Sequence, residues 1–119
     1  MKPISNDLCK TKAQAYHDVM FYFQNDPQIV ATYDQRGKHI YTGNSKGKIL
    51  VVANVKDKEG EKDFKTVACF KVLQASQSAT AIKSIEFARR TKSFLVNTAD
   101  RVIRVYKTTD VMQLKKGSP

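Results

Sequence analysis

One pattern occurs twice in this chain, at a spacing of 54 residues. Sliding the sequence by this amount pairs residues 33–52 with residues 87–106 without a gap. Throughout the overlap, turn residues meet turn residues and apolar runs meet apolar runs. The identical positions are Arg36, Lys38, Ile49 and Val51, matched by Arg90, Lys92, Ile103 and Val105. A repeat at this spacing indicates one supersecondary unit that occurs twice and packs against its neighbour.

Each unit reads as a meander of short strands separated by turns. Apolar alternation and turn residues predict the first set of strands at 29–33, 39–43, 49–55 and 65–73. The second set is predicted at 81–87, 94–98 and 102–106, with a fourth strand beginning at 112–114. The segment 56–63 is charged apart from one glycine, so we expect it to form a solvated loop.

The N-terminal part, residues 1–27, lies outside the repeat. Leu8, Ala15, Val19 and Phe23 fall at helical spacing behind cap residues, which is compatible with a short helix. Val19 to Phe23 is, however, a continuous run of aromatic and β-favouring residues stopped by Asn25-Asp26-Pro27. We therefore predict a strand at 19–24 and leave the rest of this segment unassigned.

The repeated unit resembles a WD-repeat propeller blade, with Asp100 at the place where such blades carry a structural aspartate. Three stretches, Tyr41–Val51, Thr80–Arg89 and Asn97–Tyr106, closely resemble two consecutive blades of the retinoblastoma-binding protein 5 family. The tryptophan-aspartate pair of the repeat is replaced by Tyr106-Lys107 and by Val52-Ala53, and the chain contains no tryptophan. A short polar side chain at a tight turn bonds its own backbone, so we assign Asp100 a structural role.

The resemblance implies an all-β chain that forms part of a WD-repeat β-propeller, with about two four-stranded antiparallel blades. The first blade is expected over 28–73, with the charged loop at 56–63, and the second over 74–114, followed by a tail at 115–119. Propellers close with about 4 to 8 blades. Two blades leave two apolar flanks uncovered, so we expect a fragment of a larger protein or a chain that depends on a partner.

Charge points to an acidic partner. The sequence carries 21 Lys and Arg against 11 Asp and Glu, a formal net charge of +10. Residues 1–28 are neutral, so the whole excess lies in residues 29–119. Nucleic acid is the first candidate for such a balance.

The basic residues form two groups in a blade arrangement. Turns at Arg36 and Lys38 and at Arg89, Arg90 and Lys92 would share one face of the disc. Lys46, Lys48 and Arg101 would lie on the opposite face. For Arg36, Lys38, Arg89, Arg90, Lys92 and Arg101, two interpretations stay open: contact with the phosphates of nucleosomal DNA, or a solvated rim that keeps the protein soluble.

Other classes of function are disfavoured. His17 and His39 have no nearby nucleophile or carboxylate at a recurring spacing, and Cys9 and Cys69 form neither a metal motif nor a disulfide framework. No apolar run approaches the ~20 residues of a membrane helix. We therefore expect no catalytic residue, cofactor, metal, small-molecule substrate or membrane partner.

The resemblance implies a nuclear, non-catalytic scaffold subunit of a histone H3 lysine methyltransferase complex of the COMPASS or mixed-lineage-leukaemia type, in contact with other subunits. Two alternatives remain open: a WD-repeat adaptor of an unrelated assembly, such as a ubiquitin ligase, and a truncated product without independent activity.

Overall fold

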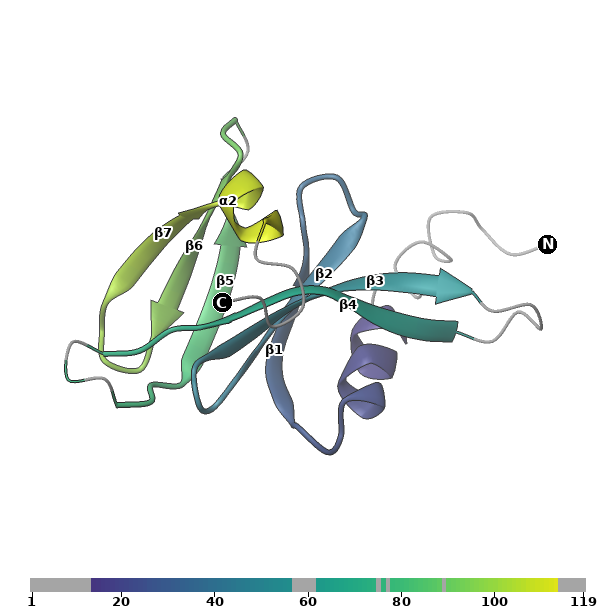
Figure 1. Ribbon diagram of the computed structural model, residues 1–119, viewed down its shortest axis with the longest axis horizontal. Coiled ribbons are helices and arrows are strands. Elements are labelled where there is room, and N and C mark those ends of the chain that lie inside the picture. Colours follow the sequence, from purple (N-terminus) through teal and green to yellow (C-terminus); the bar gives the residue numbers. More distant parts are fainter. Residues whose placement is uncertain (1–13, 57–61, 75, 77, 89, 114–119) are drawn as a thin grey trace.

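Two antiparallel sheets stand side by side in the computed structural model, which describes residues 14–56, 62–74, 76, 78–88 and 90–113 (Figure 1). The first sheet has the order β1-β2-β3-β4 and the second the order β5-β6-β7. Their strands are β1 (Gln28–Tyr33), β2 (His39–Asn44), β3 (Lys48–Lys56), β4 (Lys62–Lys71), β5 (Ile82–Phe87), β6 (Ser93–Thr98) and β7 (Ile103–Lys107). The fold is that of a partial all-β WD-repeat propeller, and each sheet is one blade.

The 54-residue repeat is confirmed down to the pairing of single residues. In the first blade Gln28 pairs with Asn44 and Tyr33 with Ile40. In the second blade their counterparts Ile82 and Thr98 pair, as do Phe87 and Phe94. The register shift between Gln28 and Val30 recurs between Ile82 and Ser84. The pairing of β2 with β3 also matches the pairing of β6 with β7 after a step of 54 residues, so both blades share one backbone pattern.

Two predicted features of the strands differ from the structure. The fourth strand expected from Met112 is wrong, because α2 (Thr108–Met112) follows β7 and inserts Val111 into the apolar layer between the sheets. Leu114 lies outside the described residues. The expected loop at 56–63 is too long, because ladder pairing continues to Lys56 and Lys62. Strand pairing thus extends into charged sequence that has no apolar pattern.

The predicted strand at 19–24 is also wrong, because residues 14–22 form a helix. Ala15 and Val19 lie one helical turn apart and are buried, whereas Phe21 is 65% exposed. The buried side packs on Ile40 and Val52 of the first sheet. Tertiary contact with this sheet therefore overrides the local preference of the aromatic run for a strand. No helix among the described residues is long and apolar enough to cross a membrane.

The two blades share one apolar layer. Tyr41 contacts Phe94 with ring centroids 5.1 Å apart, and Phe70 contacts Tyr106 at 5.0 Å. Ile82 lies directly against Gly43, where a β-carbon would come within 2.6 Å of the Ile82 side chain. Glycine at this position allows the backbone of β2 to approach the second sheet closely.

Each blade has a second flank, and the two are not alike. The outer flank of the first blade is covered by the helix 14–22, which corrects the expectation that both outer flanks are bare. The outer flank of the second blade carries Ile103 and Val105, which are 63% and 65% exposed. These side chains alternate along β7 with the partly buried Arg104 and Tyr106.

Two glycines with positive φ provide a matched test of close packing. Gly37 (φ 71°) has no atom within 4 Å of an added β-carbon, whereas at Gly47 (φ 87°) that carbon would lie 2.3 Å from the Val72 carbonyl oxygen. We expect Gly37→Ala to lower the free energy of unfolding by about 1–2 kcal/mol through backbone strain alone. Gly47→Ala should lower it by about 1–3 kcal/mol more, because backbone atoms must move. Urea unfolding of both variants measures the difference, and equal losses would contradict this packing.

Candidate nucleic-acid interface

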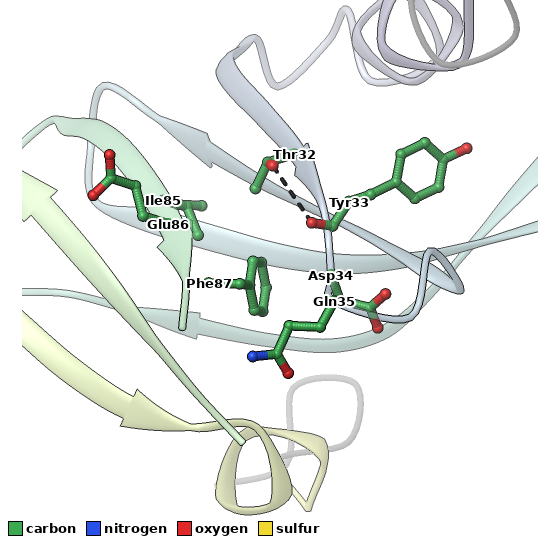
Figure 2. Close-up of a pocket in the computed structure, with 7 residues that line it drawn as sticks. All are labelled: Thr32, Tyr33, Asp34, Gln35, Ile85, Glu86 and Phe87. Atoms are coloured by element: carbon green, nitrogen blue, oxygen red, sulfur yellow. Dashed lines mark hydrogen bonds between the residues drawn. The ribbon is translucent and has the colours of Figure 1, made fainter. Parts of the chain in front are cut away.

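The β1–β2 turn and the β5–β6 turn lie against each other at one end of the blade pair. The Gln35 side chain donates from Nε2 to the Thr91 carbonyl oxygen over 2.8 Å. A pocket of about 630 Å³ is lined by residues at and just beyond the ends of β1 and β5, among them Gln35 and Phe87. Figure 2 draws these lining residues as sticks. The contact between Gln35 and Thr91 brings together basic residues that are 54 residues apart in the sequence.

The first turn is held by Asp34. Its Oδ1 accepts from the backbone N–H of Lys38 at 2.9 Å, and its Oδ2 lies 3.5 Å from Nδ1 of His39. The Gly37 N–H donates to the Asp34 carbonyl oxygen at 3.1 Å. These contacts with Asp34 hold the backbone of the turn in place. The side chains of Arg36 and Lys38 are both exposed to solvent on it.

The second turn is held by hydroxyl groups and by α2. The hydroxyls of Thr91 and Ser93 lie 2.6 Å apart. The Lys92 carbonyl oxygen accepts from both the backbone N–H and the hydroxyl of Thr108, at 2.7 and 3.0 Å. Arg90 and Lys92 are exposed on this turn, and Arg89 lies outside the described residues.

A pocket of about 450 Å³ lies between the two turns and α2, and we call it the basic pocket. Arg36, Lys38 and Lys92 line it, together with the carboxylate of Asp34, the buried Tyr41 and polar groups of α2. Burial raises the pKa of Tyr41 to about 12, so its phenol stays protonated at neutral pH. Over the residues that the structure describes, no carboxylate pairs with these three cations. Three cations against the one carboxylate of Asp34 leave the basic pocket with an excess of positive charge, which suits an anionic group such as a phosphate.

The remaining basic residues of the prediction lie elsewhere. Arg101 is exposed in the β6–β7 turn, where its φ is 66°, at the opposite end of the second blade. Lys46 is exposed in the β2–β3 turn. Lys48 is paired with Asp26, with Nζ and Oδ2 3.0 Å apart. The structure thus unites Arg36, Lys38, Arg90 and Lys92 at one end and separates Arg101 from them.

Sequence reasoning missed a polar network around Arg104. Its guanidinium donates to Asp100 at 3.1 Å, to the Thr98 hydroxyl at 2.6 Å and to the Leu73 carbonyl oxygen at 3.2 Å. These bonds from Arg104 and Thr98 lower the pKa of Asp100 to about 2. The structural role predicted for Asp100 therefore extends beyond its own turn. The opposite charges of Asp100 and Arg104, four residues apart, could have indicated their ion pair. Nothing in the sequence indicates the hydrogen bond from Arg104 to the Leu73 carbonyl oxygen.

A second network ties the start of β1 to the β2–β3 turn. Asn44 accepts at Oδ1 from the backbone N–H groups of Lys46 and Lys48, at 2.9 and 2.8 Å. Its amide donates to Asp26 at 3.1 Å. The hydrogen bond from Lys48 lowers the pKa of Asp26. Within the described residues, no three His, Cys, Asp or Glu side chains gather as they would around a metal ion.

Several known proteins with similar sequences are named as retinoblastoma-binding proteins. A fruit fly (Drosophila melanogaster) protein, the retinoblastoma-binding protein 5 homolog, is 56% identical over 95 residues, which are 79% of this chain and 18% of the fly protein. Protein RBL of Arabidopsis thaliana is 36% identical over 65% of the chain, and the retinoblastoma-binding-like protein E of Dictyostelium discoideum is 32% identical over 68%. The chain belongs to the retinoblastoma-binding protein 5 family.

The family resemblance read from the sequence is thereby confirmed. The chain spans less than a fifth of the length of the relatives it matches, covering 18% of the fly protein and 12% of the plant protein. No protein-family model matches the chain.

The Asp100 network predicts a pH dependence of stability. Because the folded pKa of Asp100 lies near 2, below the unfolded value of about 3.9, its contribution is complete above about pH 5 and is lost as the pH falls toward 2. Asp100→Asn should be less stable than the wild type at pH 7, and the difference should shrink as the pH falls through the unfolded pKa of about 3.9 and disappear only below the folded pKa of about 2. Urea unfolding across this range measures it. Asp110→Asn, an exposed acid of α2, is the control, and an equal pH-dependent loss there would contradict the assignment.

Proposed function

We propose that the chain acts as a non-catalytic WD-repeat subunit, or as part of one, in a COMPASS-like histone H3 lysine methyltransferase complex in the nucleus. The observation that carries this is the 56% identity with the fly retinoblastoma-binding protein 5 homolog over 95 residues. Blades of this kind present turns and flanks to partner proteins. In this proposal the chain contacts other subunits of the complex.

The basic pocket and the turns beside it are proposed to contact the phosphates of nucleosomal DNA. Arg36, Lys38, Arg90 and Lys92 are exposed at one end, and no acidic side chain pairs with them within the described residues. Arg and Lys side chains that hold phosphates contribute affinity without reading base sequence. The chain would thereby help to hold the assembly on the nucleosome, in a manner that salt weakens.

The proposed non-catalytic role rests on the family resemblance. Among the described residues, Asp100 and Asp26 are paired with Arg104 and Lys48, and Oδ2 of Asp34 lies 3.5 Å from Nδ1 of His39. These pairs support the turns that carry them.

Membership of the complex has a direct test. A tagged copy of the full chain, expressed in nuclei, should recover the catalytic and accessory subunits of a histone H3 lysine methyltransferase complex, identified by mass spectrometry. A copy with Ile103→Lys and Val105→Lys tests whether the exposed flank takes part. Recovery of ubiquitin-ligase subunits in place of methyltransferase subunits would contradict the proposal.

The phosphate contact predicts a change in salt dependence. The variant Arg36→Glu, Arg90→Glu, Lys92→Glu should bind mononucleosomes more weakly. The slope of log affinity against log salt should fall by about 0.9 for each phosphate that the variant no longer neutralises. A titration between 50 and 200 mM salt, roughly the range in which such contacts are resolved, measures it.

A matched control carries the same change of charge elsewhere. Lys65, Lys71 and Lys83 are exposed on strands of the two sheets, and replacing them with glutamate alters the net charge equally. We expect a smaller decrease of affinity and a smaller change of slope for this control. Equal effects of the two triple variants would mean that net charge alone, and not the basic pocket, attracts the nucleosome.

A further inference from the structure

An exposed hydroxyl group lies among the cations of the basic pocket. Thr109 of α2 lines this pocket together with Arg36, Lys38 and Lys92. The side chain of Thr109 is exposed to solvent. A threonine hydroxyl can carry a phosphate, and a phosphate beside a cluster of cations forms charge-assisted hydrogen bonds with them. The basic pocket therefore combines a group that can be phosphorylated with the cations that can hold the product.

The position of Thr109 is fixed by its neighbours in α2. The backbone N–H and the hydroxyl of Thr108 both donate to the Lys92 carbonyl oxygen, at 2.7 and 3.0 Å. Val111 is 2% exposed and packs in the apolar layer between the sheets. Because α2 is attached on both sides of Thr109, this hydroxyl stays beside the turn that carries Lys92.

The charges of the basic pocket match those of one phosphate. Among the described residues that line the pocket, Asp34 is the carboxylate. It is engaged with the Lys38 N–H at 2.9 Å and lies 3.5 Å from Nδ1 of His39. Three cations against this one carboxylate leave an excess of two positive charges, with His39 counted as neutral. A phosphothreonine carries a charge of about −1.5 to −2 at pH 7, so a single phosphate nearly cancels this excess.

We propose that Thr109 is a phosphorylation site, and that its phosphate binds in the basic pocket of the same chain and excludes the phosphates of other molecules. The phosphoryl donor is ATP, bound to a protein kinase. The bond from the γ-phosphorus to the oxygen that bridges it to the β-phosphorus breaks, and a bond from the γ-phosphorus to Oγ1 of Thr109 forms. The hydroxyl proton passes to a base of the kinase, and ADP leaves.

A phosphate on Thr109 has an advantage over a phosphate from solution. The hydrogen bond from Gln35 to Thr91 holds the two turns that carry the cations side by side. An attached group enters the pocket without the loss of translational freedom that a free ligand undergoes, so its effective concentration is high. Phosphorylation would thus change the basic pocket from open to occupied. This consequence rests on the proposed function where the excluded phosphates are those of nucleosomal DNA.

The capture of the phosphate can be measured without knowing the kinase. Phosphothreonine is placed at position 109 of the full chain during translation, and phosphorus NMR follows the second pKa of the phosphate, about 6 without charged neighbours. Neighbouring cations favour the dianion, so we expect this pKa to fall by about one unit. Arg36→Ala with Lys92→Ala should remove most of the decrease. Asp34 and His39, which face the same pocket, stay present in every variant.

A second pair of substitutions is the control for overall charge. Lys65 and Lys83 are exposed on strands, so Lys65→Ala with Lys83→Ala removes the same charge away from the basic pocket. This pair should leave the decrease of the phosphate pKa unchanged. An unshifted pKa in the parent chain, or an equal response to both pairs, would overturn the proposal. So would a lower unfolding temperature of the chain with phosphothreonine at 109 than of the unmodified chain, since a captured phosphate stabilises the fold.

Exclusion is tested with inorganic phosphate. Added to the unmodified chain, it should shift the amide NMR signals of Arg36 and Lys92, and phosphothreonine at 109 should abolish these shifts. Phosphoserine at Ser45, exposed in the β2–β3 turn at the other end of the first blade, is the matched control and should preserve them. Equal shifts in the unmodified chain and in the chain with phosphothreonine at 109, or shifts in neither, would refute the exclusion.

The modification itself is tested on the chain recovered from nuclei. Mass spectrometry should place a phosphate on Thr109, with loss of this phosphate in Thr109→Ala and recovery of phosphorylation in Thr109→Ser. Unphosphorylated Thr109 in this material would reject the assignment. These readouts do not use nucleosomes, so a failure of the unmodified chain to bind nucleosomes would reject the proposed DNA contact alone. Equal nucleosome binding by the unmodified chain and the chain with phosphothreonine at 109 would reject the exclusion alone.

Discussion

The rings of Tyr41, Phe94 and Tyr106 join the two sheets, and the position of the surface groups follows from this contact. Phe94 lies 5.1 Å from Tyr41 and 5.5 Å from Tyr106, measured between ring centroids. Aromatic pairs at such distances stabilise a core beyond the effect of buried area. With the sheets fixed in this way, the β1–β2 and β5–β6 turns are brought to one end, where Gln35 bonds to Thr91.

The repeat could be read from the sequence because register is a local property. Turn residues and apolar alternation recur at the same spacing in both blades, and a slip of one residue would turn every apolar side chain to the wrong face. The helix 14–22 could not be predicted, since the run from Val19 to Phe23 suits either conformation. Its contact with Ile40 and Val52, distant in sequence, decides the outcome.

Some residues of the candidate site could be predicted from the sequence and others could not. Arg36, Lys38 and Lys92 were found from the sequence because exposed turns carry them, and their common pocket follows from blade geometry. Arg104 was missed, because its bond to the Leu73 carbonyl depends on the chain that crosses between the blades. The number of Lys and Arg residues also overstates the positive charge that is available to bind a partner, because Lys48 and Arg104 are already paired with Asp26 and Asp100.

The β3–β4 hairpin extends past the part of the blade that the repeat shares. The counterpart of Ala53 is Lys107, the last residue of β7, while β3 and β4 continue to pair as far as Lys56 and Lys62. Residues of β3 beyond Ala53 therefore have no equivalent in β7. The repeat therefore fixes the strand pairing only up to Ala53 and Lys107, and the paired backbone of β3 and β4 beyond that point is an addition of the first blade alone.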